Sequence, residues 1–180
     1  MDHDFAEVGI DDEDDNIEDI HLTFKVSSAA YAVCVTHVTE IVRIQDINHL
    51  PGMPDGFCGV INLRGHVVPV LDMQARFGGP SLDTNDRTVI VVLEVDGERA
   101  GLMVEEVTEV VDFPSDSIES ATSSVGRERS KNTLVSGIAK RGDRMCMILD
   151  VRKMLNDSVP TPPEEADVDA TQIALEAAEV

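Results

Sequence analysis

The side chains that could carry out chemistry are few and are scattered along this chain. There are three cysteines and five histidines, but no GxSxG turn and no Cys motif with a matching His and Asn, as nucleophilic catalysis would need. No HxH or HExxH spacing gathers metal ligands, and GFCG and FGG lack the spacing of a phosphate-binding loop. We therefore predict a binding protein with no enzymatic activity, cofactor or metal.

The three cysteines, Cys34, Cys58 and Cys146, lie among aliphatic residues and have no CxxC spacing. We expect free thiols that pack as small hydrophobic side chains in a reducing compartment. The acidic run from Asp11 to Asp15 superficially resembles a calcium loop. It lacks the turn glycine and the terminal glutamate of such a loop, so we expect a solvated tail.

Glu40 in VTEIVR and Arg64 in INLRG are charged residues within mainly apolar stretches. An arginine at a hairpin tip is more often solvated than engaged in a contact, and a glutamate beside aliphatic residues can be only the polar side of an element. An exposed ion pair between them would contribute about 0–1 kcal/mol, too little to explain a fold. The two residues alone leave both a docking role and a solvated surface open.

The segment from Gly59 to Phe77 predicts the hairpin that would carry Arg64. Two apolar runs flank Asn62-Leu63-Arg64-Gly65, and Asn and Gly favour the positive φ angles of a tight reversal. Pro69 has no N–H group, so the returning strand is expected to meet a sheet edge or a bulge there.

Strand signals dominate the rest of the chain. Asp96-Gly97 and Arg141-Gly142-Asp143 are hairpin signals between apolar runs. Helical turns are predicted over Met73 to Phe77, Thr36 to Ile41 and Val151 to Asn156. The predicted strands are Leu22 to Val26, Tyr31 to Val35, Val60 to Leu63, Val67 to Leu71, Thr88 to Val95, Arg99 to Val104, Val107 to Asp112, Val135 to Lys140 and Arg144 to Leu149.

The formal charge of −21 is concentrated at the ends of the chain. Residues 1–20 hold ten of the 35 acidic side chains and residues 160–180 hold six, without Lys or Arg, which leaves 19 acidic against 14 basic residues between them. Acidic tails explain this better than salt adaptation, which would spread acidic residues over the folded part. Nucleic acid and anionic lipid are poor partners. Without a leader or a run of about 20 apolar residues, we expect a cytoplasmic protein with no membrane insertion.

The order of these stretches resembles the CheW family of chemotaxis scaffold proteins. The likeness begins at LTFKVSSAAYAV and continues through VTEIVR, INLRG and RTVIVVLEVDGERAGLMVEEV to VSGIAKRGDRMCMILDVRKML. It covers about three quarters of the chain, and the INLRG hairpin is its most specific part. Cys58, His66 and the acidic ends depart from the family pattern, whereas Glu40 and Arg64 do not.

The resemblance implies an all-β fold of two five-stranded SH3-like barrels that share a hydrophobic core, with short helices. Each lobe would have only about 65–70 residues, for which a separate core is marginal, so we expect the two lobes to unfold together. We assign residues 20–157 to a CheW-like domain. Residues 1–19 are predicted to be an acidic, disordered tail, and residues 158–180 an acidic, flexible tail.

The resemblance also implies two partners: the cytoplasmic tip of a methyl-accepting chemotaxis receptor and the regulatory domain of the histidine kinase CheA. Val38 and Ile41 would supply apolar surface to the receptor, and Glu40 would orient Arg64. The kinase-facing residues stay open. The alternatives are a CheW-like coupling protein of a non-chemotactic kinase pathway, such as twitching motility or development, and a generic SH3-like binding module. Carried over residue by residue, the receptor-facing set is Val38, Glu40, Ile41, Asn62, Leu63, Arg64 and Gly65.

Overall fold

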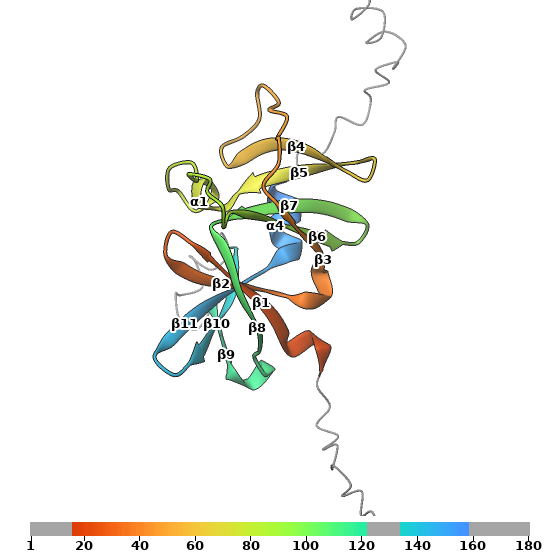
Figure 1. The fold of residues 1–180 in the computed structure, drawn as a ribbon. Coiled ribbons are helices and arrows are strands. Elements are labelled where there is room, and N and C mark those ends of the chain that lie inside the picture. The colour runs from red at the N-terminus through yellow and green to blue at the C-terminus, as the bar shows by residue number, and fades with distance from the viewer. Residues whose placement is uncertain (1–15, 122–133, 159–180) are drawn as a thin grey trace, which may run out of the picture.

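The computed structural model describes residues 16–121 and 134–158, which form two β-sheets and several short helices (Figure 1). The six-stranded sheet has the order β8-β1-β2-β11-β10-β9, and the five-stranded sheet has the order β3-β6-β7-β5-β4. Neighbouring strands are antiparallel except for β2 with β11 and β5 with β7. The chain is an all-β protein with two lobes.

Lobe 1, the six-stranded sheet, is assembled from the two ends of the described chain, and lobe 2 is continuous between them. The strands of lobe 1 are β1 (Ile20–Val26), β2 (Ala29–Cys34), β8 (Glu106–Asp112), β9 (Ile118–Ser120), β10 (Val135–Arg141) and β11 (Arg144–Leu149). Those of lobe 2 are β3 (Val38–Arg43), β4 (Phe57–Leu63), β5 (His66–Asp72), β6 (Val89–Val95) and β7 (Glu98–Val104). The helical elements are η1 (Ile17–Asp19), η2 (Val35–His37), α1 (Met73–Arg76), η3 (Ser115–Ser117) and α4 (Val151–Ser158).

One hydrophobic cluster joins the two lobes. It contains Phe24 and Val33 of lobe 1, Leu93 and Leu102 of lobe 2, and Met154 of α4, all without measurable exposure to solvent. The helix α4 follows the last strand of lobe 1 but packs against β6 and β7 of lobe 2. The expected shared core of two β lobes is therefore confirmed.

Three features differ from the sequence expectations. The helical turn expected over Thr36 to Ile41 is wrong: only η2 is helical, and β3 follows directly because its β-branched residues pair with β6. The short strand β9 was not predicted, and it gives lobe 1 six strands where five were expected. The 3-10 turn η1 lies within the range that the sequence analysis assigned to the N-terminal tail.

The tight turns follow the glycine signals in part. Asp96 and Gly97 adopt φ angles of 53° and 85°, as the hairpin between β6 and β7 requires. Between β1 and β2, however, Ser27 and Ser28 take φ angles of 50° and 66° without a glycine, and the Ser27 N–H donates to the Glu105 carboxylate at 2.7 Å. Pro69 lies in the internal strand β5, immediately before the residues of β5 that pair with β7.

Candidate functional site

The hairpin between β4 and β5 presents Arg64 at its tip. Arg64 and Gly65 form the two-residue turn, with φ angles of 53° and 84°. The Gly65 N–H donates to the Asn62 side-chain oxygen at 3.0 Å, so the asparagine stabilises the reversal as the sequence suggested. The turn therefore holds the backbone of Arg64 in one defined conformation while its side chain stays exposed.

Arg64 reaches Glu40 of β3, although β3 and β4 are opposite edges of the lobe 2 sheet. The guanidinium lies 3.4 Å from the Glu40 carboxylate. Asn48, which follows β3, exchanges two backbone hydrogen bonds of 2.9 Å with Val60 of β4. The sheet thus curls until its edges meet, and this closure brings VTEIVR and INLRG together.

The remaining residues of the receptor-facing set lie in different environments. Ile41 is 44% exposed, and Asn62 and Gly65 are exposed as well. Val38 is half-buried and packs against the shared core, and Leu63 packs against the core of lobe 2. The structure therefore brings the set together around Glu40 and Arg64, but only Ile41 offers apolar surface outward.

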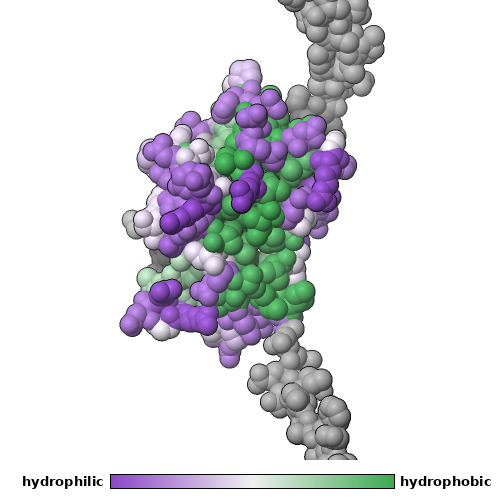
Figure 2. Space-filling view, viewed as in Figure 1, coloured by the Kyte–Doolittle hydropathy of each residue, from purple (hydrophilic) through white to green (hydrophobic). Residues whose placement is uncertain are grey.

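A hydrophobic band runs down the middle of the face shown in Figure 2, over the region where β3, β1 and β8 lie in Figure 1. Exposed hydrophobic residues on elements at this face are Ile17 of η1, Ile41 of β3 and Val110 of β8. The sequence analysis included only Ile41 among functional residues. The adjacent pair Val110 and Val111 was an available signal, because one of two neighbouring strand residues must face outward.

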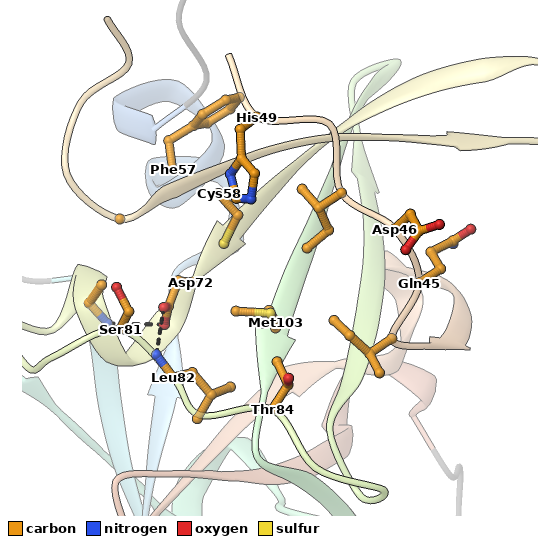
Figure 3. A pocket seen from close by; sticks show the side chains of 14 residues that line it. Gln45, Asp46, His49, Phe57, Cys58, Asp72, Ser81, Leu82, Thr84 and Met103 are labelled. Atoms are coloured by element: carbon orange, nitrogen blue, oxygen red, sulfur yellow. Dashed lines mark hydrogen bonds between the residues drawn. The ribbon is translucent and has the colours of Figure 1, made fainter. Parts of the chain in front are cut away.

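A second feature of lobe 2 is a cavity of about 780 Å³ between residues 44–49, β4 and the loop 81–84. Figure 3 shows His49, Cys58 and Asp72 around it, a combination that superficially resembles a thiol nucleophile with a base and an acid. Asp72 is buried and already accepts hydrogen bonds from the Ala75 N–H at 3.1 Å and the Leu82 N–H at 2.8 Å. It caps α1 and ties the following loop to the barrel.

The thiol of Cys58 is poorly suited to nucleophilic attack. Burial, with a smaller contribution from the charge of Asp72, raises the pKa of Cys58 to about 12. A catalytic cysteine requires the opposite shift, because the thiolate is the reactive form. Within residues 16–121 and 134–158, no group of three His, Cys, Asp or Glu side chains is arranged as a metal site.

We expect Cys58 to react with iodoacetamide at pH 8 roughly 1,000-fold more slowly in the folded protein than in urea, because its pKa of about 12 leaves little thiolate. Cys146, whose pKa burial raises to about 11, should be slowed about 100-fold. Mass spectrometry of the labelled peptides measures each rate. Equal rates for Cys58 in the folded and unfolded states would contradict the raised pKa, and a faster rate in the folded state would reveal an activated thiol.

Comparison with known proteins decides the family. A family model described as CheW-like domain matches residues 21–159. The chain belongs to the CheW family. It is 31% identical over 147 residues to the chemotaxis protein CheW of Bacillus subtilis, covering 81% of this chain and 93% of that protein. It is also 26% identical over 135 residues to the CheW of Klebsiella aerogenes, covering 75% and 80% of the two chains.

A solved CheW structure supports the same assignment. The crystal structure of the scaffolding protein TtCheW from Thermoanaerobacter tengcongensis superposes with a TM-score of 0.65 at 30% sequence identity, covering 74% of this chain and 89% of that one. The family thus places this chain among the chemotaxis scaffold proteins. No helix in the described part of this CheW-family chain is long and apolar enough to cross a membrane.

Proposed function

We propose that this chain is a cytoplasmic, non-enzymatic adapter that couples methyl-accepting chemotaxis receptors to the histidine kinase CheA. The observation that carries the proposal is the fixed Arg64 turn beside Glu40, in a chain of the CheW family. A planar guanidinium on a fixed turn, with a carboxylate beside it, is suited to carboxylate or carbonyl groups of a partner helix.

The hydrophobic band next to this pair supports a helical partner. Ile41 and Val110 are exposed aliphatic side chains on β3 and β8, and Figure 2 shows continuous apolar surface over this region. An amphipathic helix buries its apolar face in such a surface, whereas its polar flank can meet charged residues at the rim. We infer that the receptor tip lies across this face and contacts Arg64 at the end of the hairpin.

Replacing Arg64 by Ala is expected to weaken binding of a receptor-tip fragment by about tenfold or more, because charge-assisted contacts to a partner contribute about 1.5–3 kcal/mol. The thermal transition should be unchanged, since Arg64 is exposed and its pair with Glu40 is a surface pair. Binding is measured by calorimetry, and coupling by kinase activity reconstituted with CheA and the receptor tip.

Arg99 provides the matched control. It is an exposed arginine in the same sheet and is paired with Glu94. Arg99→Ala should leave receptor binding unchanged, because β6 and β7 contribute no residue to the receptor-facing set. Equal losses of receptor affinity in the two variants would indicate that the net charge of the protein, and not the position of Arg64, governs binding. Loss of folding in Arg64→Ala would show that Arg64 has a structural role. A pull-down with this chain that recovers a kinase but no receptor would favour the alternative of a non-chemotactic pathway.

A further inference from the structure

Each lobe has a hydrophobic cluster of its own on the sheet face opposite the shared core, and the cluster of lobe 1 has smaller side chains. Half of its six buried residues are alanine or cysteine: Ala32, Val111, Phe113, Ala139, Cys146 and Ile148. In lobe 2 none of the six is smaller than valine: Ile61, Val68, Val70, Ile90, Val92 and Met103. Because protein interiors are closely packed, smaller side chains on a sheet of six strands leave unfilled space.

The unfilled space is a cavity of about 560 Å³, within the range of volumes of sites that hold small ligands. Val111, Phe113 and Cys146 of the lobe 1 cluster line it. Ala30 of β2, which is half-buried and packs against the same cluster, lines it as well. The cavity therefore opens onto the apolar side chains of lobe 1.

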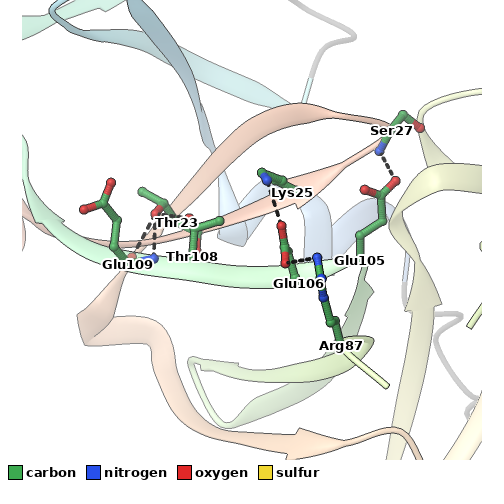
Figure 4. Close-up of polar contacts among 8 residues, drawn as sticks. All are labelled: Thr23, Lys25, Ser27, Arg87, Glu105, Glu106, Thr108 and Glu109. Carbon is green, nitrogen blue, oxygen red and sulfur yellow. Dashed lines mark hydrogen bonds and ion pairs between the residues drawn. The ribbon is translucent and has the colours of Figure 1, made fainter. Parts of the chain in front are cut away.

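The polar groups in the wall of this cavity are already hydrogen-bonded. The hydroxyl groups of Thr23 and Thr108 lie 2.7 Å apart, and Thr23 also donates to the Glu109 carbonyl at 2.8 Å (Figure 4). In the part of the chain that the structure describes, no buried side-chain nitrogen or oxygen lacks a hydrogen-bond partner. The body of a ligand here need not be polar, and an aliphatic chain suits the wall.

The basic side chains that line the cavity gather at one end of it. β2 and β11 are parallel and each begins just after a hairpin turn, so the two turns lie at the same end of the sheet. Lys25 precedes the first turn, and Arg141 and Arg144 flank the second. Val111 pairs with His21, at the other end of β1 from Lys25. The cavity thus has a basic end and an apolar end.

Arg141 and Arg144 are the basic residues at this end that can still receive an anion. Lys25 is engaged by Glu106 at 2.7 Å (Figure 4). Arg141 lies 3.8 Å from the Glu109 carboxylate, which is too far for a hydrogen bond. Arg144 forms no ion pair with another described residue, and it is paired with Arg141 across β10 and β11. The two arginines can therefore bind one carboxylate between them.

We propose that the cavity of lobe 1 binds a small aliphatic carboxylate, with its chain against Val111, Phe113 and Cys146 and its carboxylate at Arg141 and Arg144. The chain fills the space that the small side chains leave, and the arginines neutralise the charge. Octanoate matches this description, and for a ligand of its size we expect a dissociation constant of about 1 mM. The site does not include the receptor-facing set, so this inference is independent of the proposed receptor coupling.

Calorimetric titration of the full-length chain with octanoate should show saturable binding at one site. Octanol has the same chain without the charge and should bind at least about tenfold more weakly, because charge-assisted hydrogen bonds are lost. Saturating octanoate should slow the alkylation of Cys146 by iodoacetamide about tenfold, since the ligand covers the thiol. The alkylation of Cys58, which lines the cavity of lobe 2, should not change.

Three substitutions test the two ends of the site. Ala30→Leu places a larger side chain in the cavity and should lower the octanoate affinity at least about tenfold. Arg144→Ala should lower the octanoate affinity about tenfold and leave the octanol affinity unchanged. Glu109→Gln removes the carboxylate that competes for Arg141 and should raise the octanoate affinity about threefold.

Ala75→Leu is the matched control, because Ala75 is half-buried like Ala30 but lines the cavity of lobe 2. It should leave octanoate binding unchanged, and so should Arg99→Ala, which removes an exposed arginine from lobe 2. A thermal scan of each variant establishes that it is folded. If Ala30→Leu does not fold, the substitution of the exposed Arg144 decides the question.

Two kinds of result would overturn the proposal. One is the absence of saturable octanoate binding, or an equal loss of affinity in folded Ala30→Leu and Ala75→Leu. The other is saturable binding that slows the alkylation of Cys58 as much as that of Cys146, because the ligand would then lie outside the cavity of lobe 1.

Discussion

Gly59→Ala is expected to lower the free energy of unfolding by about 3 kcal/mol or more. Gly59 has a φ angle of 142°, a conformation essentially confined to glycine, and it follows an irregularity in the pairing of β4 with β5. A Cβ atom there would lie 2.2 Å from the Asn48 carbonyl oxygen and 2.9 Å from the Ile47 side chain. Since Asn48 closes lobe 2 by pairing with Val60, the clash falls on the contact that joins the two sheet edges. Urea unfolding measures the loss.

Gly97 separates the steric effect at Gly59 from the general cost of a positive φ angle. It lies at a turn with a φ angle of 85°, and a Cβ atom there would meet nothing within 4 Å. Gly97→Ala should therefore cost only about 1 kcal/mol. Equal losses of unfolding free energy in Gly59→Ala and Gly97→Ala would mean that residues 47 and 48 can move away from Gly59 at little cost. The closure of lobe 2 would then not be rigid.

Met154→Ala is expected to lower the free energy of unfolding by about 2–5 kcal/mol and to destabilise both lobes together. Met154 is fully buried in the cluster that joins the lobes, and α4 packs against β6 and β7. Tyr31 of lobe 1 also stacks on Phe77, just beyond α1, with ring centroids 4.6 Å apart. A cavity at Met154 therefore removes contacts that belong to both lobes.

Two probes follow the two lobes during this unfolding. Labelling of Cys146 on β11 reports on lobe 1, and labelling of Cys58 on β4 reports on lobe 2. The two urea midpoints should coincide in the unaltered chain and in Met154→Ala. Arg152→Ala, on the exposed side of α4, is the control and should change stability by less than about 1 kcal/mol. Separate midpoints would show that each lobe folds on its own core.

The parts of the fold that depend on neighbouring residues in the chain, such as tight turns, could be predicted from the sequence. Asp96-Gly97 and Asn62-Leu63-Arg64-Gly65 specified their turns because the required φ angles favour those residue types. Part of β3 was predicted as a helical turn because the strand has few apolar residues and their spacing fits both the helical and the strand period. The three-residue strand β9 has too few residues to give any pattern.

The candidate site was predictable in its members but not in its geometry. The family resemblance supplied Glu40 and Arg64, whereas their contact depends on the closure of lobe 2 through Asn48 and Val60. No local pattern contains that pairing, because its partners are twelve residues apart and meet only when the sheet curls. Val38 and Ile41 were both expected to supply apolar surface, but they lie three positions apart on a strand whose side chains alternate, so Ile41 faces outward while Val38 packs against the core.

The division of lobe 1 between the two ends of the described chain has a consequence for biosynthesis. On the ribosome, β3 to β7 emerge as an uninterrupted unit, whereas β1 and β2 must wait for β11, the parallel neighbour of β2, which lies more than a hundred residues later. Nascent chains will therefore carry uncovered apolar strands until β11 has emerged, and chaperone demand should last until then.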